Sequence, residues 1–526
     1  MKQPWYQNPM LWMLGGAAGT AMTLVFPVIG LLEWLFLAVM TAGVFRLCAN
    51  GACGARKAYG YGFLTVYFYY FIVYHWFVNL YPLNFIGMDK QSSLIVVLAG
   101  WFGLPLLQAV LGGFVFLIYR AVERTALLTR VPLAKPFAFA ALWTVFEWSS
   151  TIGWTGVPWG RLALGQIKML PMLQSASLLG SYFVGFLMLS VAGLLAFAYL
   201  NRPRALLCGV LAGAIFGSNL LFGAVSCLVP KKTDTTLRVA VVQGNIDSHE
   251  KWVGDTSRRT REVYERLTRA AVADGAELVL WPETAFPYDL SYQGPTREFL
   301  CELADECDIT MIVGGLASDE THEYNALFLI DPDGNFSEQF YAKRHLVPFG
   351  EYVPMREVIM TLIPPLAELS ALDDDLTPGE GTALFETAWG EVGSLICFDS
   401  IYEQLTLDSV GDGADLMVVS SNDSWFSDSA GVYQHQAQAQ LRAIESGRYF
   451  VRAANTGIST VLSPTGEILE WIDPLAEGYA VAEVGMRSQR TLYDHVGNLF
   501  VYLCIALIAA VPIANVIYKK KTTVYS

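Results

Sequence analysis

Two hydrophobic patterns divide the chain. Long apolar stretches dominate its first part and return once near its end, at residues 10–27, 28–47, 62–80, 93–118, 136–152, 178–199, 205–228 and 498–517. Each stretch approaches the ~20 apolar residues that an α-helix needs to cross the hydrocarbon core of a bilayer. We therefore predict about eight transmembrane helices, seven before residue 230 and one after residue 495.

Residues 230–495 follow a different pattern. Short apolar runs typical of strands, the first at 237–246 and the second at 276–281, alternate with amphipathic stretches typical of helices, at 256–274 and 431–446. Hairpin turns are expected at Asp333-Gly334 and near Trp389-Gly390. The pattern predicts an α/β domain in which helices cover a sheet, with two such layers face to face.

Composition excludes several classes of protein. Residues 1–229 hold 13 Lys/Arg and 4 Asp/Glu, which leaves 21 and 44 of the chain's totals of 34 and 48 for residues 230–526. The acidic second part lacks the basic face that binding to nucleic acid requires. The eight cysteines include no C-x-x-C pair, so neither a zinc site nor a disulfide framework is indicated. We expect no metal and no organic cofactor.

Basic residues in the short connections predict the orientation of the spans. With eight spans, five basic groups fall on one side: Lys2, the Arg46/Arg56/Lys57 loop, the Arg120/Arg124/Arg130/Lys135 loop, Arg202 with Arg204, and Lys519 to Lys521. That side is expected to be the cytoplasm. The predicted organisation is therefore a membrane domain (1–229), an outer domain (230–495) that faces the periplasm in a bacterium, and a C-terminal transmembrane helix with a basic tail (496–526).

Two carboxylates, Glu33 and Glu147, fall inside predicted spans. An acidic residue within a membrane is a functional candidate by default. Both lie near a span end or beside a tryptophan, so we expect their side chains to reach the membrane interface.

Three reactive side chains follow predicted strands in the outer domain: Glu283 in "WPET", Lys343 in "YAKRH" and Cys397 in "ICFDS". Strand ends that are distant in sequence often form one active site, so a cleft at one edge of a sheet is expected to collect all three. A cysteine attacks as its thiolate and needs a base, which Glu283 supplies. A lysine ammonium, with the backbone N–H after Cys397, stabilises an oxyanion. Singly, such residues are more often structural or solvated.

The sequence around these residues resembles the carbon–nitrogen hydrolase (nitrilase) superfamily and, within it, the apolipoprotein N-acyltransferase family. The resemblance rests on Trp252 and on six motifs: "VVQGNI" (241–246), "WPETAFP" (281–287), "KRHLVPFGEYVP" (343–354), "LICFD" (395–399), "SNDSWFSDSAGVYQHQ" (421–436) and "LRAIESGRYFVRAANTGIS" (441–459). It implies a nitrilase-like αββα sandwich beside a polytopic helical membrane domain. Because the family commonly has Cys-Tyr-Glu where this chain has Cys397-Phe398-Asp399, a hydroxyl is absent and the carboxylate is one methylene shorter.

The resemblance also implies an activity and roles for the site residues. Cys397 is the nucleophile, Glu283 the general base and Lys343 the oxyanion stabiliser; Glu351, Trp252, Phe398 and Asp399 support them. An acyl chain passes from a membrane phospholipid, expected to be phosphatidylethanolamine, through a thioester to the α-amino group of a lipoprotein's diacylglyceryl-cysteine, the last step of lipoprotein maturation. The implied location is the bacterial inner membrane, and a monomer is expected. The alternatives are a membrane-anchored amidase or nitrilase-type hydrolase and a non-enzymatic sensor.

Two further segments are candidates for contact with lipid. The segment 351–379 combines four prolines with a cluster of Met, Ile and Leu. It either packs on its own domain or forms an arm that touches lipid and gates acyl-chain entry. The loop 150–172, rich in Trp and Gly, is a second candidate doorway.

Overall fold

The computed structural model describes residues 7–49, 53–83, 88–246, 256–362 and 375–524. The chain forms two compact units. One combines residues 1–78, 96–229 and 496–526, and the other combines residues 79–95 and 230–495. Predicted residue Trp252 and the middle of the 351–379 segment lie outside the described residues.

The first unit is helical. Its principal helices are α1 (Pro9–Val25), α2 (Glu33–Ala49), α3 (Ala55–Val73), α4 (Lys90–Glu123), α6 (Lys135–Ser149), α9 (Ser181–Leu200), α10 (Ala205–Leu228) and α18 (Leu499–Val524), and its short helices are α5 (Ala126–Arg130), α7 (Leu170–Leu173) and α8 (Ala176–Leu179). Every apolar stretch predicted to span the membrane therefore holds a helix.

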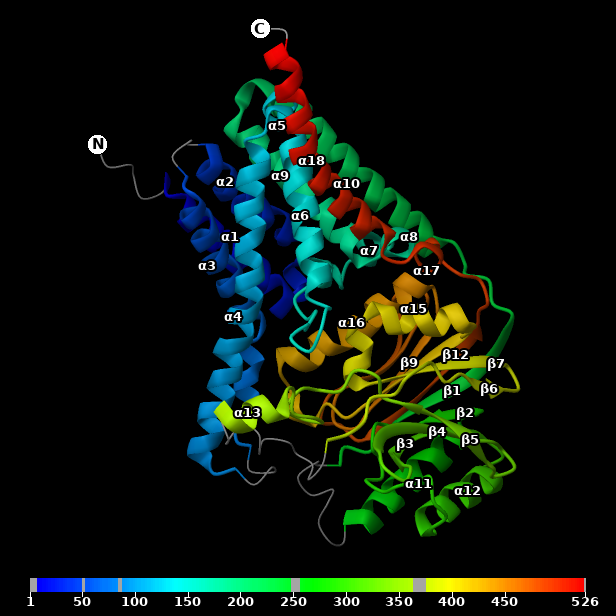
Figure 1. Cartoon of the computed structure of the whole chain (residues 1–526). Helices are drawn as coiled ribbons and strands as arrows, with labels where there is room; N and C mark the ends of the chain where they lie inside the picture. The colour runs from blue at the N-terminus through cyan, green and yellow to red at the C-terminus, as the bar shows by residue number, and fades with distance from the viewer. Residues whose placement is uncertain (1–6, 50–52, 84–87, 247–255, 363–374, 525–526) are drawn as a thin grey trace. The chain divides into compact units, whose positions relative to one another are not determined.

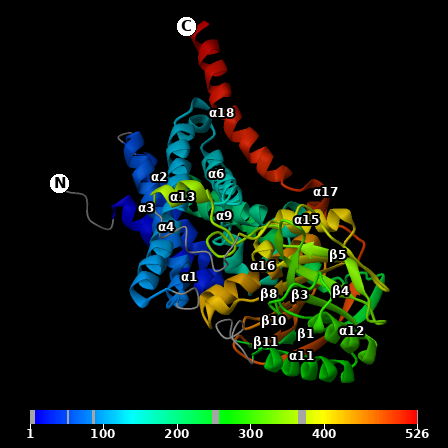
Figure 2. The same cartoon turned by 60° about the horizontal axis from the view of Figure 1, so that its bottom comes forward.

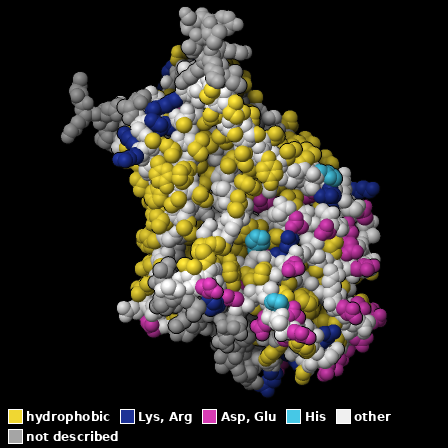
Figure 3. Space-filling view, viewed as in Figure 1, with side chains coloured by type: hydrophobic (Ala, Val, Ile, Leu, Met, Phe, Trp, Pro, Cys, Tyr) yellow, Lys and Arg dark blue, Asp and Glu magenta, His cyan; other side chains and the backbone are white. Residues whose placement is uncertain are grey.

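Five helical segments in the described part of the chain are long and apolar enough to cross a membrane: Pro27–Ala49, Lys90–Glu123, Ser181–Leu200, Arg202–Leu228 and Leu499–Val516. Their outer faces are apolar, as Leu206 on α10 and Leu507 on α18 illustrate with exposed fractions of 83% and 66%. Hydrophobic side chains cover most of this unit's visible surface (Figure 3). Such a surface requires lipid, so the chain is a membrane protein. The total of eight spans stays a prediction.

Glu33 and Glu147 do not reach an interface, contrary to expectation. Their exposed fractions are 0% and 3%. Glu33 Oε2 accepts a hydrogen bond of 2.7 Å from Gln166 Nε2, and Glu147 Oε1 accepts one of 2.9 Å from the backbone N–H of Leu162. Both partners belong to the loop 150–172. The second half of that loop is therefore folded into the helical unit. There it supplies the hydrogen-bond donors that a buried carboxylate needs.

The second unit contains two six-stranded sheets. The first has the order β12-β1-β2-β3-β4-β5, formed by Gly478–Met486, Thr235–Gln243, Leu278–Leu280, Thr310–Ser318, Glu323–Ile330 and Phe336–Ala342. The second has the order β11-β10-β9-β8-β7-β6, formed by Ile468–Ile472, Ser459–Leu462, Phe450–Ala454, Leu416–Ser421, Gly390–Ile396 and Phe385–Thr387. The helices are α11 (Thr256–Ala273), α12 (Pro295–Cys307), α13 (Arg356–Leu362), α15 (Glu403–Asp412), α16 (Ala430–Ser446) and α17 (Leu492–Val496).

The alternation along β1 shows how the layers pack. Val239 and Val241 pack between the sheets with residues of β7, β8 and β9, whereas Ala240 and Val242 pack with residues of α11 and α12. Successive side chains of a strand point to opposite faces, so the first sheet has helices on one face and the second sheet on the other. Helices α15 and α16 cover the outer face of the second sheet (Figures 1 and 2). The predicted αββα sandwich is confirmed.

Both predicted hairpins are present, with β4 antiparallel to β5 and β6 antiparallel to β7. Strand β12 and helix α15 were not predicted from the sequence. Strand β12 pairs antiparallel with β1 from Tyr479 beside Val242 to Gly485 beside Thr236, although it follows β1 by more than 200 residues. Only the assembled sheet brings the two together, so local sequence carried no sign of the pairing.

Candidate active site

The three predicted catalytic residues follow strands of both sheets. Glu283 follows β2 and Lys343 follows β5 in the first sheet, whereas Cys397 follows β7 in the second. We expected one edge of a single sheet to supply all three residues, but Cys397 comes from the second sheet. It packs where the two sheets face each other. The charges of Glu283 and Lys343 both act on the pKa of Cys397. The three side chains are therefore close enough to interact electrostatically.

Lys343 lies between two carboxylates. Its Nζ is 3.0 Å from Glu283 Oε1 and 2.9 Å from Glu351 Oε1, and its exposed fraction is 1%. Burial lowers the pKa of Lys343, but the charges of Glu283 and Glu351 outweigh that effect and hold the pKa well above its usual value. The side chain is therefore a fixed ammonium donor, which suits an oxyanion stabiliser.

Asn325 on β4 joins the two carboxylates. Its Nδ2 donates to Glu283 Oε1 at 2.7 Å and to Glu351 Oε1 at 2.9 Å. The remaining oxygens accept backbone N–H groups, Glu283 Oε2 from Asn422 at 2.9 Å and Glu351 Oε2 from Val347 at 2.8 Å. Both carboxylates are thus held in fixed orientations. Asn325 was missed because it lies near the start of β4, whereas the candidate residues were those that follow strands.

Cys397 follows β7 and has a backbone φ of +51°, in the left-handed region that non-glycine residues rarely adopt. A short 3-10 helix, Cys397–Ile401, begins at this residue. Burial raises the pKa of the Cys397 thiol; the charge of Glu283 raises it further and that of Lys343 lowers it. The resting residue is therefore a thiol that needs a base during attack, and its strained backbone is typical of functional sites.

Asp399 is an interior residue. Its exposed fraction is 0%, and its carboxylate accepts hydrogen bonds from His345 N at 2.7 Å, Tyr341 Oη at 2.9 Å and Ile396 N at 3.1 Å. Burial raises the pKa of Asp399 to about 6, with Lys343 and the three donors opposing the shift. Neighbouring Phe398 packs edge-on against Tyr402, at 5.5 Å between ring centres.

A second buried cluster surrounds the turn at Cys397. His435 on α16 lies 3.1 Å from the Cys397 carbonyl oxygen and 2.8 Å from Asp423 Oδ1, and Arg452 on β9 donates to Asp423 Oδ2 at 2.6 Å. Arg452 and His435 hold the pKa of Asp423 below its usual value despite burial. Sequence reasoning assigned no role to these residues, although all three lie in motifs that carry the family resemblance.

Cys397, Asp423 and His435 could in principle accommodate a metal ion, because their donor atoms lie within 4.8 Å of one another. Asp423 is already bonded to Arg452, His435 and Ser421 Oγ, the last at 2.8 Å. A guanidinium at this position opposes the binding of a cation, so the cluster fits a hydrogen-bonded network better than a metal centre.

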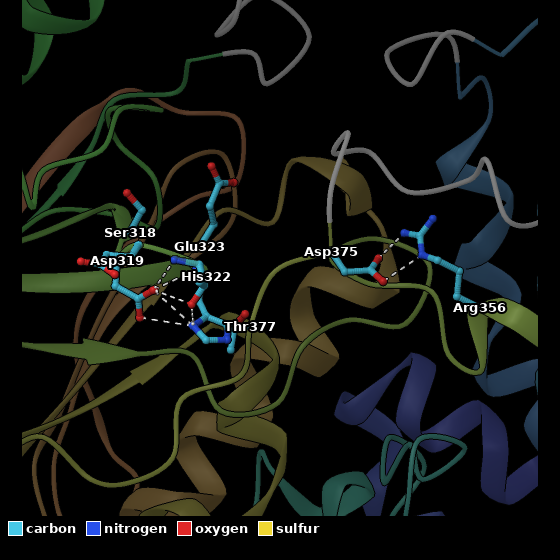
Figure 4. A pocket seen from close by; sticks show the side chains of 9 residues that line it. Ser318, Asp319, His322, Glu323, Arg356, Asp375 and Thr377 are labelled. Carbon is cyan, nitrogen blue, oxygen red and sulfur yellow. Dashed lines mark hydrogen bonds and ion pairs between the residues drawn. The ribbon is translucent and has the colours of Figure 1, made fainter.

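An open hollow of about 720 Å³ lies elsewhere in the second unit. Its lining is polar: the loop between β3 and β4 contributes Asp319 and His322, and Arg356 pairs with Asp375 across from them (Figure 4). None of Glu283, Lys343 and Cys397 lines it. The hollow offers charged groups rather than apolar surface, so it does not fit an acyl chain.

Comparisons with known proteins match both units. The family model described as "Carbon-nitrogen hydrolase" matches residues 238–492, and that described as "Apolipoprotein N-acyltransferase N-terminal domain" matches residues 18–194. An apolipoprotein N-acyltransferase of Geobacter metallireducens is 30% identical, covering 96% of this chain and 95% of the relative. One of Gloeobacter violaceus is 32% identical, covering 93% and 91%.

Solved structures match about half of the chain. An amidase from Nesterenkonia sp. is 18% identical with a TM-score of 0.38, and the match covers 50% of this chain and 94% of the amidase. A nitrilase-superfamily protein of Saccharomyces cerevisiae is 21% identical with a TM-score of 0.38, covering 49% and 93%.

Proposed function

Because the chain belongs to the apolipoprotein N-acyltransferase family, we propose that it transfers an acyl chain from a membrane phospholipid to the N-terminal amino group of a diacylglyceryl-lipoprotein, with Cys397 as the nucleophile. The observation that carries this assignment is the pair of contacts from Lys343 Nζ, 3.0 Å to Glu283 and 2.9 Å to Glu351, in the same electrostatic environment as Cys397. These contacts support a buried site with Glu283 as the base, Lys343 as the oxyanion donor and Cys397 as the nucleophile.

The first half-reaction forms a thioester. Glu283 takes the proton from Cys397 Sγ as the sulfur attacks the sn-1 ester carbonyl of the phospholipid. Lys343 stabilises the tetrahedral oxyanion. The intermediate collapses with cleavage of the ester C–O bond, and the proton on Glu283 passes to the departing glycerol oxygen. The products are a Cys397 thioester and a lysophospholipid.

The second half-reaction forms an amide. The α-amino group of the lipoprotein's diacylglyceryl-cysteine attacks the thioester carbonyl, and Glu283 accepts the amine proton. Lys343 stabilises the second oxyanion. Cleavage of the C–S bond returns the sulfur to Cys397, which recovers its proton from Glu283. The scheme is ping-pong, because the lysophospholipid leaves before the amine reacts.

The substrates and location complete the proposal. Phosphatidylethanolamine is the expected donor, the enzyme acts as a monomer, and residues 230–495 form the catalytic domain on the periplasmic side of the inner membrane. Support for this orientation comes from the basic connections on the opposite side of the predicted spans. Both substrates are lipids, which explains why the catalytic unit belongs to a chain with long apolar helices.

Intact-protein mass spectrometry tests the nucleophile. Purified full-length protein given phosphatidylethanolamine without an acceptor should gain one acyl chain, and neutral hydroxylamine should remove it. A diacylglyceryl-cysteine peptide should discharge the adduct and emerge N-acylated. Cys397→Ala should form no adduct, whereas the matched control Cys301→Ala, a half-buried cysteine of the same unit, should behave like the wild type. An acyl adduct on Cys397→Ala at the wild-type rate would refute the assignment.

A further inference from the structure

A short segment of the second unit binds to the backbone that carries Lys343 and Glu351. We call residues 375–379 the bridging segment. Its backbone donates three hydrogen bonds to carbonyl oxygens: from Leu376 N to Glu351 at 2.9 Å, from Thr377 N to Glu323 at 2.7 Å and from Gly379 N to Lys343 at 2.8 Å. The bridging segment therefore joins the two residues whose side chains form the 2.9 Å ion pair of the candidate site.

Gly379 lets one end of the bridging segment approach β5 closely. A Cβ atom at this position would lie 2.4 Å from the carbonyl oxygen of Ala342 and 2.9 Å from its Cβ. Ala342 is the last residue of β5 and immediately precedes Lys343. Cβ atoms do not approach other heavy atoms within 3.0 Å, so a larger residue here must displace the bridging segment or the end of the strand.

An ion pair holds the other end of the bridging segment. Arg356, the first residue of α13, donates from Nε to Asp375 Oδ2 at 2.9 Å and from Nη2 to Oδ1 (Figure 4). The backbone N–H of Val353, two residues after Glu351, donates to Asp375 Oδ1 at 3.0 Å. The bonds from Arg356 hold the pKa of Asp375 below its usual value, against the effect of burial. Two parallel bonds between a guanidinium and a carboxylate fix their relative orientation.

The ion pair is better suited to fixing geometry than to stabilising the fold. The exposed fractions of the Arg356 and Asp375 side chains are 35% and 34%, and water screens a pair that is this accessible. Leu376, the next residue, is 6% exposed and carries the N–H that binds the Glu351 carbonyl. Loss of the pair should therefore loosen the bridging segment beside Glu351 and leave the buried sheets intact.

We propose that the bridging segment and the Arg356–Asp375 ion pair position Glu351, and through it the Lys343 ammonium, to stabilise the oxyanion. This inference rests on the proposed function. Because the bridging segment binds the backbone of both Glu351 and Lys343, its displacement moves the carboxylate relative to the ammonium that it orients. Arg356 and Asp375 act through Glu351, so they are positioning residues. A displacement of about 1 Å near a reacting group can cost about 10²-fold in rate.

Variants at the two ends of the bridging segment test the proposal. Gly379→Ala should slow formation of the acyl adduct by about 10²-fold. The matched control Gly381→Ala should leave the rate unchanged, because a Cβ atom there meets no other atom within 4 Å.

At the other end, Arg356→Gln should slow the reaction about tenfold, whereas Arg356→Lys, which keeps the positive charge, should recover most of the rate. Arg266→Gln breaks an exposed ion pair with Glu477 and controls for the loss of a surface pair. The double variant Arg356→Gln/Asp375→Asn should be no slower than the slower single variant, because both act through one interaction.

The loss should fall on the maximal rate of adduct formation. Full-length protein in detergent micelles is given a series of phosphatidylethanolamine concentrations, and intact-protein mass spectrometry follows the adduct. The half-saturating concentration should stay unchanged, because the oxyanion exists only in the reaction and not in the bound ester. A merely structural ion pair would lower the melting temperature and leave the maximal rate unchanged.

Hydrogen–deuterium exchange gives a second readout that does not depend on acyl chemistry. Gly379→Ala and Arg356→Gln should each speed exchange about tenfold in peptides that cover residues 375–379, because the amides of the bridging segment lose their acceptors. Gly381→Ala should not. Wild-type exchange and wild-type adduct rates in both variants would overturn the proposal. If the wild-type protein forms no adduct at all, the proposed function fails instead, and the exchange rates alone decide whether Arg356 and Gly379 hold the bridging segment.

Discussion

Tyr341 donates a 2.9 Å hydrogen bond to Asp399, and this bond joins the two sheets. Tyr341 lies on β5, two residues before Lys343, and Asp399 lies two residues after Cys397. Both side chains are almost fully buried. The bond therefore fixes the strand that presents the ammonium relative to the turn that presents the thiol.

Tyr341→Phe should slow adduct formation and lower stability. The substitution removes one of three donors to a buried carboxylate, and a hydrogen bond to a charged group contributes about 1.5–3 kcal/mol. Thermal unfolding and the rate of acyl-adduct formation check both effects. Tyr292→Phe is the matched control, because Tyr292 is 58% exposed, and it should change neither quantity. A Tyr341→Phe enzyme with wild-type rate and stability would show that the inter-sheet bond is dispensable.

The residues after the nucleophile should differ in importance. Phe398→Tyr should leave acyl transfer within about tenfold of the wild type, or roughly 1.4 kcal/mol in the barrier, because Phe398 is assigned no bond-making role. Asp399→Ala should cost more, since it leaves the donors of Tyr341, His345 and Ile396 without their acceptor. Steady-state transfer to a diacylglyceryl-cysteine peptide measures both. Full activity in Asp399→Ala would contradict the assigned support.

Asn325→Asp should impair catalysis strongly. The native amide donates to Glu283 and Glu351, whereas a third carboxylate would accept and repel both. We expect adduct formation to fall by about 10²-fold, the size of a typical base or oxyanion contribution. Asn325→Ala should show a smaller loss, because it removes the donor without adding charge. Gln339→Glu, at an exposed position of β5, is the control for the added charge.

Stability should depend on pH through Asp399. Its pKa is raised to about 6 in the folded protein from the usual 3.8, so the folded state binds the proton more tightly than the unfolded state. Below about pH 4 the protonated Asp399 carboxyl adds to the free energy of unfolding. This contribution, on the order of 2–3 kcal/mol, is lost as pH rises toward 6. Asp399→Asn cannot ionise. The melting temperature of Asp399→Asn relative to the wild type should therefore rise between pH 4 and 6 and then level off. A difference that is flat across this window would contradict the raised pKa.

Reporter fusions should locate the catalytic unit. A phosphatase that is active only outside the cytoplasm should be active when fused after residue 230 and inactive when fused after Arg204 or at the C-terminus, because basic connections stay in the cytoplasm. Cell-surface enzyme assays with equal expression controls measure the pattern. The reverse pattern would exclude mature lipoproteins as acceptors, since their N-termini lie on the outer side.

The residues proposed for catalysis could be singled out because each follows a strand that local sequence reveals. Cys397 could be singled out by its position between an apolar run and an acidic residue, and the surrounding motifs gave it a role. Asn325 could not, because a single amide near the start of a strand has no local signature. The contact of His435 with the Cys397 carbonyl could not be predicted either, because it depends on α16 packing against a turn 38 positions earlier in the chain. Hydrophobic periodicity predicts elements, whereas these contacts arise only when elements pack.

The bond between Gln166 and Glu33 sets an order of events during biosynthesis. Gln166 follows Glu33 by 133 residues, so the ribosome has produced neither Gln166 nor the rest of its loop when α2 first reaches the translocon. The nascent α2 must therefore enter the bilayer with a carboxylate that has no permanent donor, at a cost of a few kcal/mol that its apolar neighbours offset. The loop can close onto Glu33 only afterwards. Maturation of the helical unit thus includes a post-insertion step, in which the loop supplies the donor that Glu33 lacks during insertion.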